Sequence, residues 1–175
     1  SPGASITAIG TIIDPIVLSS DDEDYDGGGQ WGGLIVEDTS ATFGQVRLEY
    51  LIVTEAGAEV TVGNKTYADN IVLDGVHDDT FIQYIQSHDS ARDGIRLQSS
   101  EDTANQARLS WLLITGASRD ALSYNNFSGL VKDMLVIHRP EFYDGVSGGR
   151  AGIYASNGNS LPLFVNVTLA GSDTT

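Results

Sequence analysis

The chain has no cysteine, and it has only nine lysine and arginine residues against 24 aspartates and glutamates, a formal net charge of −15. Without cysteine, disulfides and thiolate metal sites are excluded. The acidic balance repels polyphosphates, and no stripe of basic residues is present, which excludes nucleic acid and anionic lipid as partners. The apolar runs are too short to span a bilayer, so no membrane span is expected. An acidic, lysine-poor chain is typical of an exported protein, and we expect an extracellular or cell-surface location.

Helical periodicity is missing as well. No stretch of twelve or more residues keeps an apolar face at i, i+3, i+4 and i+7 free of turn residues. Short apolar runs alternate instead with glycine, aspartate, asparagine and serine, which predicts strands and turns. The expected strands are 5–8, 15–19, 31–36, 46–53, 59–62, 70–73, 81–87, 94–97, 107–115, 130–138, 152–155 and 164–169. The sequence predicts one all-β domain over residues 1–175, with an acidic loop at 21–29.

Three segments repeat one phrase of two short apolar strands joined by a polar turn. A ring residue or methionine recurs at Tyr84, Trp111 and Met134, in steps of 27 and 23 residues. A unit this short cannot bury its apolar face alone and must stack on its neighbours. The phrase therefore predicts a solenoid.

The strand phrases recur at unequal distances along the chain. Leu48 to Ile82 is 34 residues, Ile82 to Leu109 is 27, and Met134 to Val167 is 33. We expect the extra residues to enter at the corners, giving a solenoid with corner loops of variable length.

Several segments resemble right-handed parallel β-helix proteins. Residues 6–11 read Ile-Thr-Ala-Ile-Gly-Thr and residues 31–34 read Trp-Gly-Gly-Leu, as in a coil of that family. Residues 70–76, 82–95 and 164–169 are similar to a group of bacterial exported β-helix proteins, many of them lipoproteins of unassigned role. The resemblance covers nearly the whole chain and implies a single-stranded right-handed parallel β-helix. The family includes polysaccharide lyases, adhesins and surface proteins, so it implies no single activity.

The chain begins and ends inside the repeating pattern, without an amphipathic capping helix or a polar terminal coil. Unpaired terminal strands can pair with another copy, and a contact between unlike ends that does not close makes a filament. The alternative is that the sequence is a piece of a longer protein. We expect a structural subunit that is its own partner, stacking end to end into a filament or surface fibre.

The acidic loop is a candidate metal site. Five of six consecutive positions carry carboxylates, and oxygen ligands this dense favour Ca²⁺. The spacing is not that of an EF-hand. The alternative is a solvated acidic loop. The candidate ligands are Asp21, Asp22, Glu23, Asp24 and Asp26.

Two columns of charged residues are candidate ligand-binding positions. Asp93, Asp120 and Asp144 fall at one position of successive repeats, and Arg92 and Arg119 precede the first two. Such a ladder could hold a sugar polymer. The favoured interpretation is structural, because aspartate at a corner accepts hydrogen bonds from turn N–H groups and pairs with a neighbouring arginine.

Tyr50, Tyr84 and Trp111 share one repeat position and could form a platform for sugar rings, although a stacked core column is the favoured interpretation. No acid/base pair or Ser/His/Asp arrangement can be placed, so no catalytic residue is assigned and an enzyme is not expected. The alternative to a structural subunit is a polysaccharide-binding or lyase-like polysaccharide-degrading module.

Overall fold

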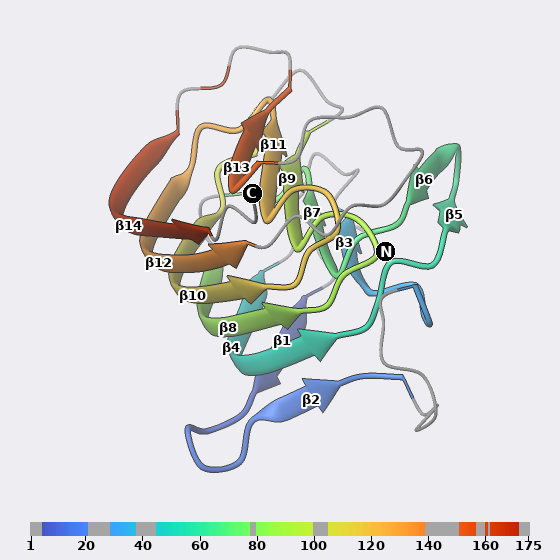
Figure 1. Ribbon diagram of the computed structural model, residues 1–175, viewed down its shortest axis with the longest axis horizontal. Helices are drawn as coiled ribbons and strands as arrows, with labels where there is room; N and C mark the ends of the chain where they lie inside the picture. Colours follow the sequence, from blue (N-terminus) through green and yellow to red (C-terminus); the bar gives the residue numbers. More distant parts are fainter. Residues whose placement is uncertain are drawn as a thin grey trace.

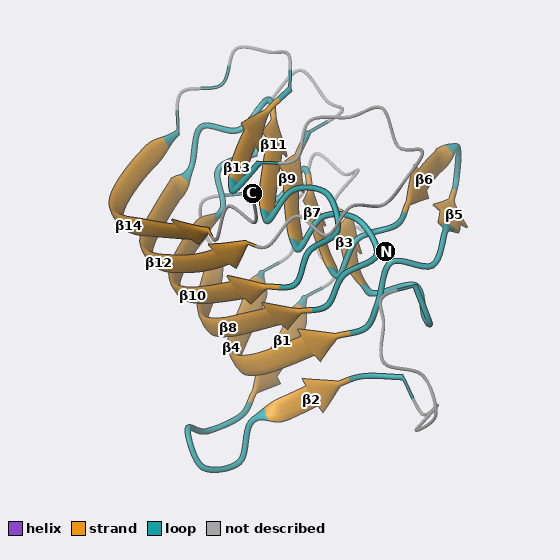
Figure 2. Ribbon diagram, viewed as in Figure 1, coloured by secondary structure: helices purple, strands orange, loops and turns teal. Residues whose placement is uncertain are grey.

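The computed structural model describes residues 5–20, 29–37, 45–77, 80–99, 105–138, 151–156, 160 and 162–171. Within these ranges there are strands and loops but no helix (Figure 2), which confirms the all-β prediction. No helix able to cross a membrane occurs in this part of the chain. The strands are β1 (Ile6–Ile9), β2 (Ile16–Leu18), β3 (Leu34–Glu37), β4 (Val46–Thr54), β5 (Val60–Val62), β6 (Lys65–Tyr67), β7 (Ile71–Asp74), β8 (Phe81–His88), β9 (Ile95–Gln98), β10 (Arg108–Thr115), β11 (Leu122–Asn125), β12 (Leu130–His138), β13 (Ile153–Ala155) and β14 (Leu163–Gly171).

Two parallel sheets make up the fold (Figure 1). The seven-stranded sheet has the order β1, β4, β8, β10, β12, β14, with β2 also paired to β4. The five-stranded sheet has the order β13, β11, β9, β7, β3. From β7 onward, each strand of one sheet is followed in the chain by a strand of the other. Because parallel neighbours cannot be joined by a tight hairpin, each connection crosses to the other sheet before it returns.

The predicted spacing of the repeats is confirmed by the register. Leu48 pairs with Ile82 and Ile82 with Leu109. Met134 pairs with Val167. These are the partners expected from steps of 34, 27 and 33 residues, so the length differences do lie in the connections between strands.

The longest of these steps contains a hairpin that the sequence analysis did not expect. Strands β5 and β6 are antiparallel and are joined by a two-residue turn at Gly63 and Asn64. The hairpin is anchored by Lys65, whose Nζ donates to Glu37 at 2.7 Å and to Asp74 at 2.9 Å. Burial opposes the charge of Lys65, but these two carboxylates outweigh it and raise the lysine pKa.

The core lies between the two sheets and consists of apolar columns that run from strand to strand. Each buried leucine or isoleucine in such a column stabilises the fold by about 1.5–3 kcal/mol. Two columns on the seven-stranded sheet are Leu48, Ile82, Leu109, Val131, Phe164 and Leu51, Ile85, Leu112, Met134, Val167; one on the five-stranded sheet is Leu34, Ile71, Ile95, Leu122, Ile153.

The long strands of the seven-stranded sheet bend near their middle, as Figure 1 shows for β10, β12 and β14. In β4 the buried positions Leu48 and Leu51 are three residues apart, so the in–out alternation changes phase between them. Tyr50 lies at this change of phase with a φ of 53°. The sequence predicts a bend between Leu48 and Leu51, and the structure confirms it.

Candidate functional site

A column of left-handed residues marks the bend in five neighbouring strands. Each has a φ between 53° and 57°, and each lies one residue before a position of the buried Leu51 to Val167 column. The column consists of Tyr50, Tyr84, Trp111, Asp133 and Asn166. Met134 therefore does not continue the ring position, as the sequence analysis expected. Asp133 does, while Met134 packs in the core with 2% of its surface exposed.

The three rings occupy a backbone conformation that does not suit them. Asparagine and aspartate enter the left-handed region most readily among residues with a side chain, whereas it costs other L-residues roughly 1–2 kcal/mol. Asp133 and Asn166 follow this preference, but Tyr50, Tyr84 and Trp111 do not. Strained residues of this kind concentrate where a side chain is used for binding or catalysis.

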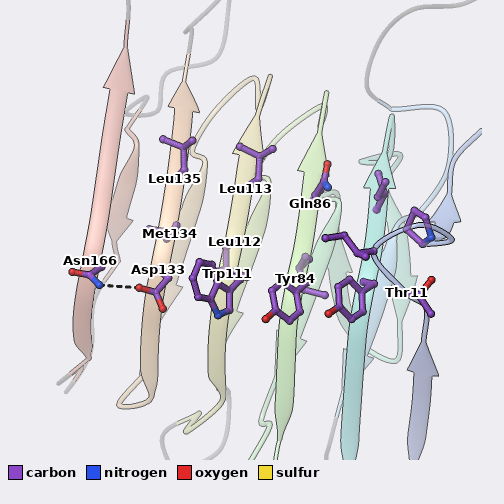
Figure 3. Close-up of a pocket in the computed structure, with 15 residues that line it drawn as sticks. Thr11, Tyr84, Gln86, Trp111, Leu112, Leu113, Asp133, Met134, Leu135 and Asn166 are labelled. Atoms are coloured by element: carbon purple, nitrogen blue, oxygen red, sulfur yellow. Dashed lines mark hydrogen bonds between the residues drawn. The ribbon is translucent and has the colours of Figure 1, made fainter.

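The rings point outward from the seven-stranded sheet (Figure 3). The interpretation of a stacked core column is therefore wrong, because Trp111 is 54% exposed. Tyr50 and Tyr84 stack with centroids 4.5 Å apart and an interplanar angle of 5°. Tyr84 and Trp111 stack at 5.9 Å and 14°. Both faces of Tyr84 are thus covered by rings, while Trp111 has a ring on one side and the smaller Asp133 on the other.

A groove of about 520 Å³ follows this column across the strands. Ile52, Gln86, Leu113 and Leu135 form the wall beside the rings, and the segment containing Thr11, Ile12 and Pro15 bounds the Tyr50 end. Five strands cross the groove, and at about 4.8 Å between strands its length is roughly 19 Å. Apolar walls of this extent with a few polar groups are typical of ligand sites.

The polar groups lie at the end of the groove away from Thr11. Asn166 Nδ2 donates to Asp133 Oδ1 at 2.9 Å, and Lys132 Nζ lies 3.6 Å from Asp133 Oδ2 (Figure 3 shows the first contact). The amide of Asn166 is thereby oriented, and its carbonyl oxygen accepts no hydrogen bond from the described residues. Trp111, Asp133 and Asn166 together present an aromatic face beside fixed hydrogen-bonding groups.

The predicted aspartate and arginine columns lie on the other sheet, at the entry to β9 and β11. Arg119 N donates to Arg92 O, which confirms that the two arginines are neighbours. Asp93 lies beside Asp120, and the register extends the column to Asp69 on one side and to Ala151 on the other. The third position is therefore not Asp144, which lies outside the described residues. A longer connection before β13 causes this shift.

Asp93 is the centre of a buried ion-pair network. Its carboxylate accepts from Arg119 Nε at 2.7 Å, from Arg119 Nη2, and from Ser123 Oγ at 2.5 Å. Arg96 Nη2 lies 3.4 Å from Asp93 Oδ2 and 3.2 Å from Asp69 Oδ1. Burial opposes ionisation of Asp93, but these donors outweigh it and hold its pKa below the ordinary aspartate value.

Asp69 and Asp120 behave differently. Each accepts a backbone N–H from the neighbouring repeat, Asp69 from Asp93 at 3.2 Å and Asp120 from Ala151 at 2.9 Å. The pKa of both carboxyls is raised, chiefly by burial, with the charge of Asp93 adding to the effect. The favoured interpretation of the aspartates, as acceptors for turn N–H groups and partners of arginine, is confirmed for Asp93 and Asp120.

Several residues of these two sites were missed by the sequence analysis. Asp69-Asn70-Ile71 has the same pattern as Asp93-Gly94-Ile95 and could have been recognised as an earlier copy. Asp133 and Asn166 could have been found from their preference for the left-handed region. Arg96 and Ser123 carry no local signal, because they contribute only through the register of β9 and β11.

The predicted calcium ligands, Asp21, Asp22, Glu23, Asp24 and Asp26, lie outside the described residues, and the calcium site stays a prediction. Comparisons of the chain with protein-family models, with curated proteins and with solved structures give no match.

Proposed function

We propose that the chain is a right-handed parallel β-helix that binds a neutral polysaccharide along the groove of the seven-stranded sheet. Its regular alternation between two parallel sheets supports the β-helix, and the general preference for right-handed crossovers between parallel strands supports the handedness. The observation that carries the binding function is the exposed face of Trp111, held in a strained backbone conformation beside Asp133 and Asn166.

The chemistry of this place matches a sugar ring. A pyranose has an apolar face of C–H groups and a rim of hydroxyls, so it requires a flat apolar surface with hydrogen-bonding groups at its edge. The indole of Trp111 provides the surface, and the Asp133 carboxylate and Asn166 amide provide the edge. The groove extends over five strands, which allows a chain of several sugars to lie across them.

Charge favours a neutral polymer over an acidic one. The net charge is −15, and among the residues that line the groove Asp133 is the one carboxylate. Glycoside hydrolysis generally uses a pair of carboxyl groups flanking the bond. A single carboxylate supports binding without catalysis. An exported location, as the composition predicts, is where such a polymer would be met.

The test is a calorimetric titration with neutral hexasaccharides of β-linked glucose, xylose and mannose. Trp111→Asn removes the indole and leaves a residue that tolerates the left-handed backbone, so we expect the affinity for the bound sugar to fall by at least about tenfold. Trp111→Phe keeps a ring and should retain part of the affinity. Tyr154→Phe, on the other sheet, should change nothing. Equal affinity of the wild type and Trp111→Asn would contradict the proposal.

End-to-end self-assembly is a second candidate function, supported by the edge strand β14. Leu169 continues an inward column through Val136 and Ile114, yet it is 55% exposed, because no described strand packs beyond it. Leu163 on the same strand is 59% exposed. Exposed apolar side chains on an unpaired edge favour pairing with another copy of the chain.

Sedimentation over a concentration series tests this candidate. We expect larger species to grow with concentration and with salt, which screens the repulsion between acidic subunits. Leu169→Lys places a charge in the contact and should prevent growth, while Lys132→Ala, away from the edge, should not. A wild-type monomer at every concentration would contradict self-assembly.

A further inference from the structure

A second pocket, of about 290 Å³, lies on the outer face of the five-stranded sheet. Arg96, Ser123 and Tyr154 form one row across β9, β11 and β13, and Gln98 and Asn125 form the next row. Arg119 and Asp120 line the pocket beside these rows. None of these side chains belongs to the groove around Trp111, which lies on the other sheet.

The two arginines are fixed in place by the buried aspartates. Arg96 Nη2 is shared between Asp69 and Asp93, and Arg119 uses Nε and Nη2 for Asp93. The guanidinium groups keep only 15% and 23% of their side-chain surface exposed. A side chain held this way loses little conformational entropy when a ligand binds to its remaining N–H groups.

Those remaining N–H groups are available. Within the described part of the chain, Nε and Nη1 of Arg96 and Nη1 of Arg119 donate to no protein group. The hydroxyl of Tyr154 and the amide of Asn125 also make no hydrogen bond there, and both line the pocket. The pocket thus gathers unpaired donors from three strands.

The charges that line the pocket leave an excess of one positive charge. Arg96 and Arg119 face one carboxylate, Asp120, whose Oδ1 accepts the N–H of Ala151 and whose Oδ2 lies 3.4 Å from Arg119 Nε. Burial raises the pKa of Asp120, which further weakens its negative charge. Arginine is the residue that pairs best with a carboxylate, because its N–H groups match the two oxygens.

We propose that this pocket binds the carboxylate of an acidic sugar. The carboxylate pairs with Arg96 and Arg119, while the hydroxyls of the sugar bond to Tyr154, Asn125 and Gln98. Three of the nine basic residues of the chain, Arg92, Arg96 and Arg119, gather at this sheet. The otherwise acidic protein thereby has a local place for an anionic group.

Calorimetric titration with a galacturonate trisaccharide tests the site, with the galactose trisaccharide as its uncharged match and acetate as the free carboxylate. We expect saturable binding of the galacturonate trisaccharide, at least about tenfold weaker binding of the other two, and weaker binding as salt rises. Equal affinity for galactose would show that the carboxylate is not recognised. Equal affinity for acetate would show that the sugar is not recognised. Either result overturns the proposal.

Two variants locate the site. Arg96→Gln removes the charge and should weaken binding by about tenfold or more, because a charge-assisted hydrogen bond is lost. Tyr154→Phe removes only a hydroxyl from a residue that is 43% exposed, so it preserves the fold and should weaken binding by roughly threefold. Trp111→Asn should leave this affinity unchanged. Unchanged binding by Tyr154→Phe and Arg96→Gln together would contradict the assignment, as would loss of binding in Trp111→Asn.

Discussion

Asp69 and Asp93 are neighbouring, fully buried aspartates whose carboxyl pKa values shift in opposite directions. Burial disfavours the charge of both. Asp93 overcomes it with the donors of Arg119 and Ser123, whereas Asp69 has one shared contact to Arg96 and a backbone N–H. Asp69 Oδ2 is buried without any hydrogen-bond partner among the described residues. A lone buried oxygen of this kind favours the protonated carboxyl.

The raised pKa of Asp69 predicts a pH-dependent stability. Since the folded pKa lies above the unfolded one, the folded state binds more protons, and this residue stabilises the fold below the unfolded pKa and loses that effect as pH rises through the folded pKa. Asp69→Asn should therefore gain stability relative to the wild type as pH rises from acid to neutral. Urea unfolding at several pH values measures the difference.

Asp93 has the opposite sign and is present in both proteins. Its lowered pKa contributes stability above the unfolded pKa, which is lost as pH falls through the folded pKa. A stability difference between wild type and Asp69→Asn that does not change with pH would show that Asp69 titrates normally in the folded protein.

At the level of single residues, the sequence predicted contacts correctly where the repeat length held. Asp93 and Asp120 are neighbours as expected, because the two strands that follow them are in the register of a 27-residue step. Met134 and Asp144 were misplaced because the connections on either side of β12 differ in length from that step. A repeat read by its residue types alone cannot tell which of two adjacent residues takes the position.

Individual strands were predicted well, since short apolar runs bounded by turn residues are a local property of the sequence. The expected strand 130–138 coincides with β12, and most others end within one or two residues of the observed bounds. Strand β6 was missed because Lys65-Thr66-Tyr67 has little apolar content. Its stability comes from the contacts of Lys65 and Tyr67 with Asp74, which lies in another strand.

Strand β10 allows a direct test of the register. Leu112 belongs to a core column and is 3% exposed, while the adjacent Leu113 lines the outer groove. Leu112→Ala should lower the free energy of unfolding by about 2–5 kcal/mol, because it leaves a cavity. Leu113→Ala should cost less than about 1 kcal/mol. Urea unfolding of both variants distinguishes the two faces, and equal losses would contradict the observed orientation of β10.

On the scale of the whole molecule, the two sheets keep two kinds of chemistry apart. The seven-stranded sheet exposes stacked rings and aliphatic side chains, and the five-stranded sheet exposes arginines and hydroxyl groups. The sequence indicated neither surface, because both are assembled from residues roughly 20 to 30 positions apart that meet only when parallel strands align. Composition predicted correctly that the strands form a single core.

Binding of a neutral sugar chain at Trp111 is the central claim, and tryptophan fluorescence tests it most directly. The chain has two tryptophans, so Trp31→Phe leaves Trp111 as the single emitter. Titration with neutral hexasaccharides up to about 10 mM, a range that covers even weak binding, should give a saturable change in emission from at least one of them. Emission unchanged by every neutral hexasaccharide would contradict a sugar-binding face at Trp111.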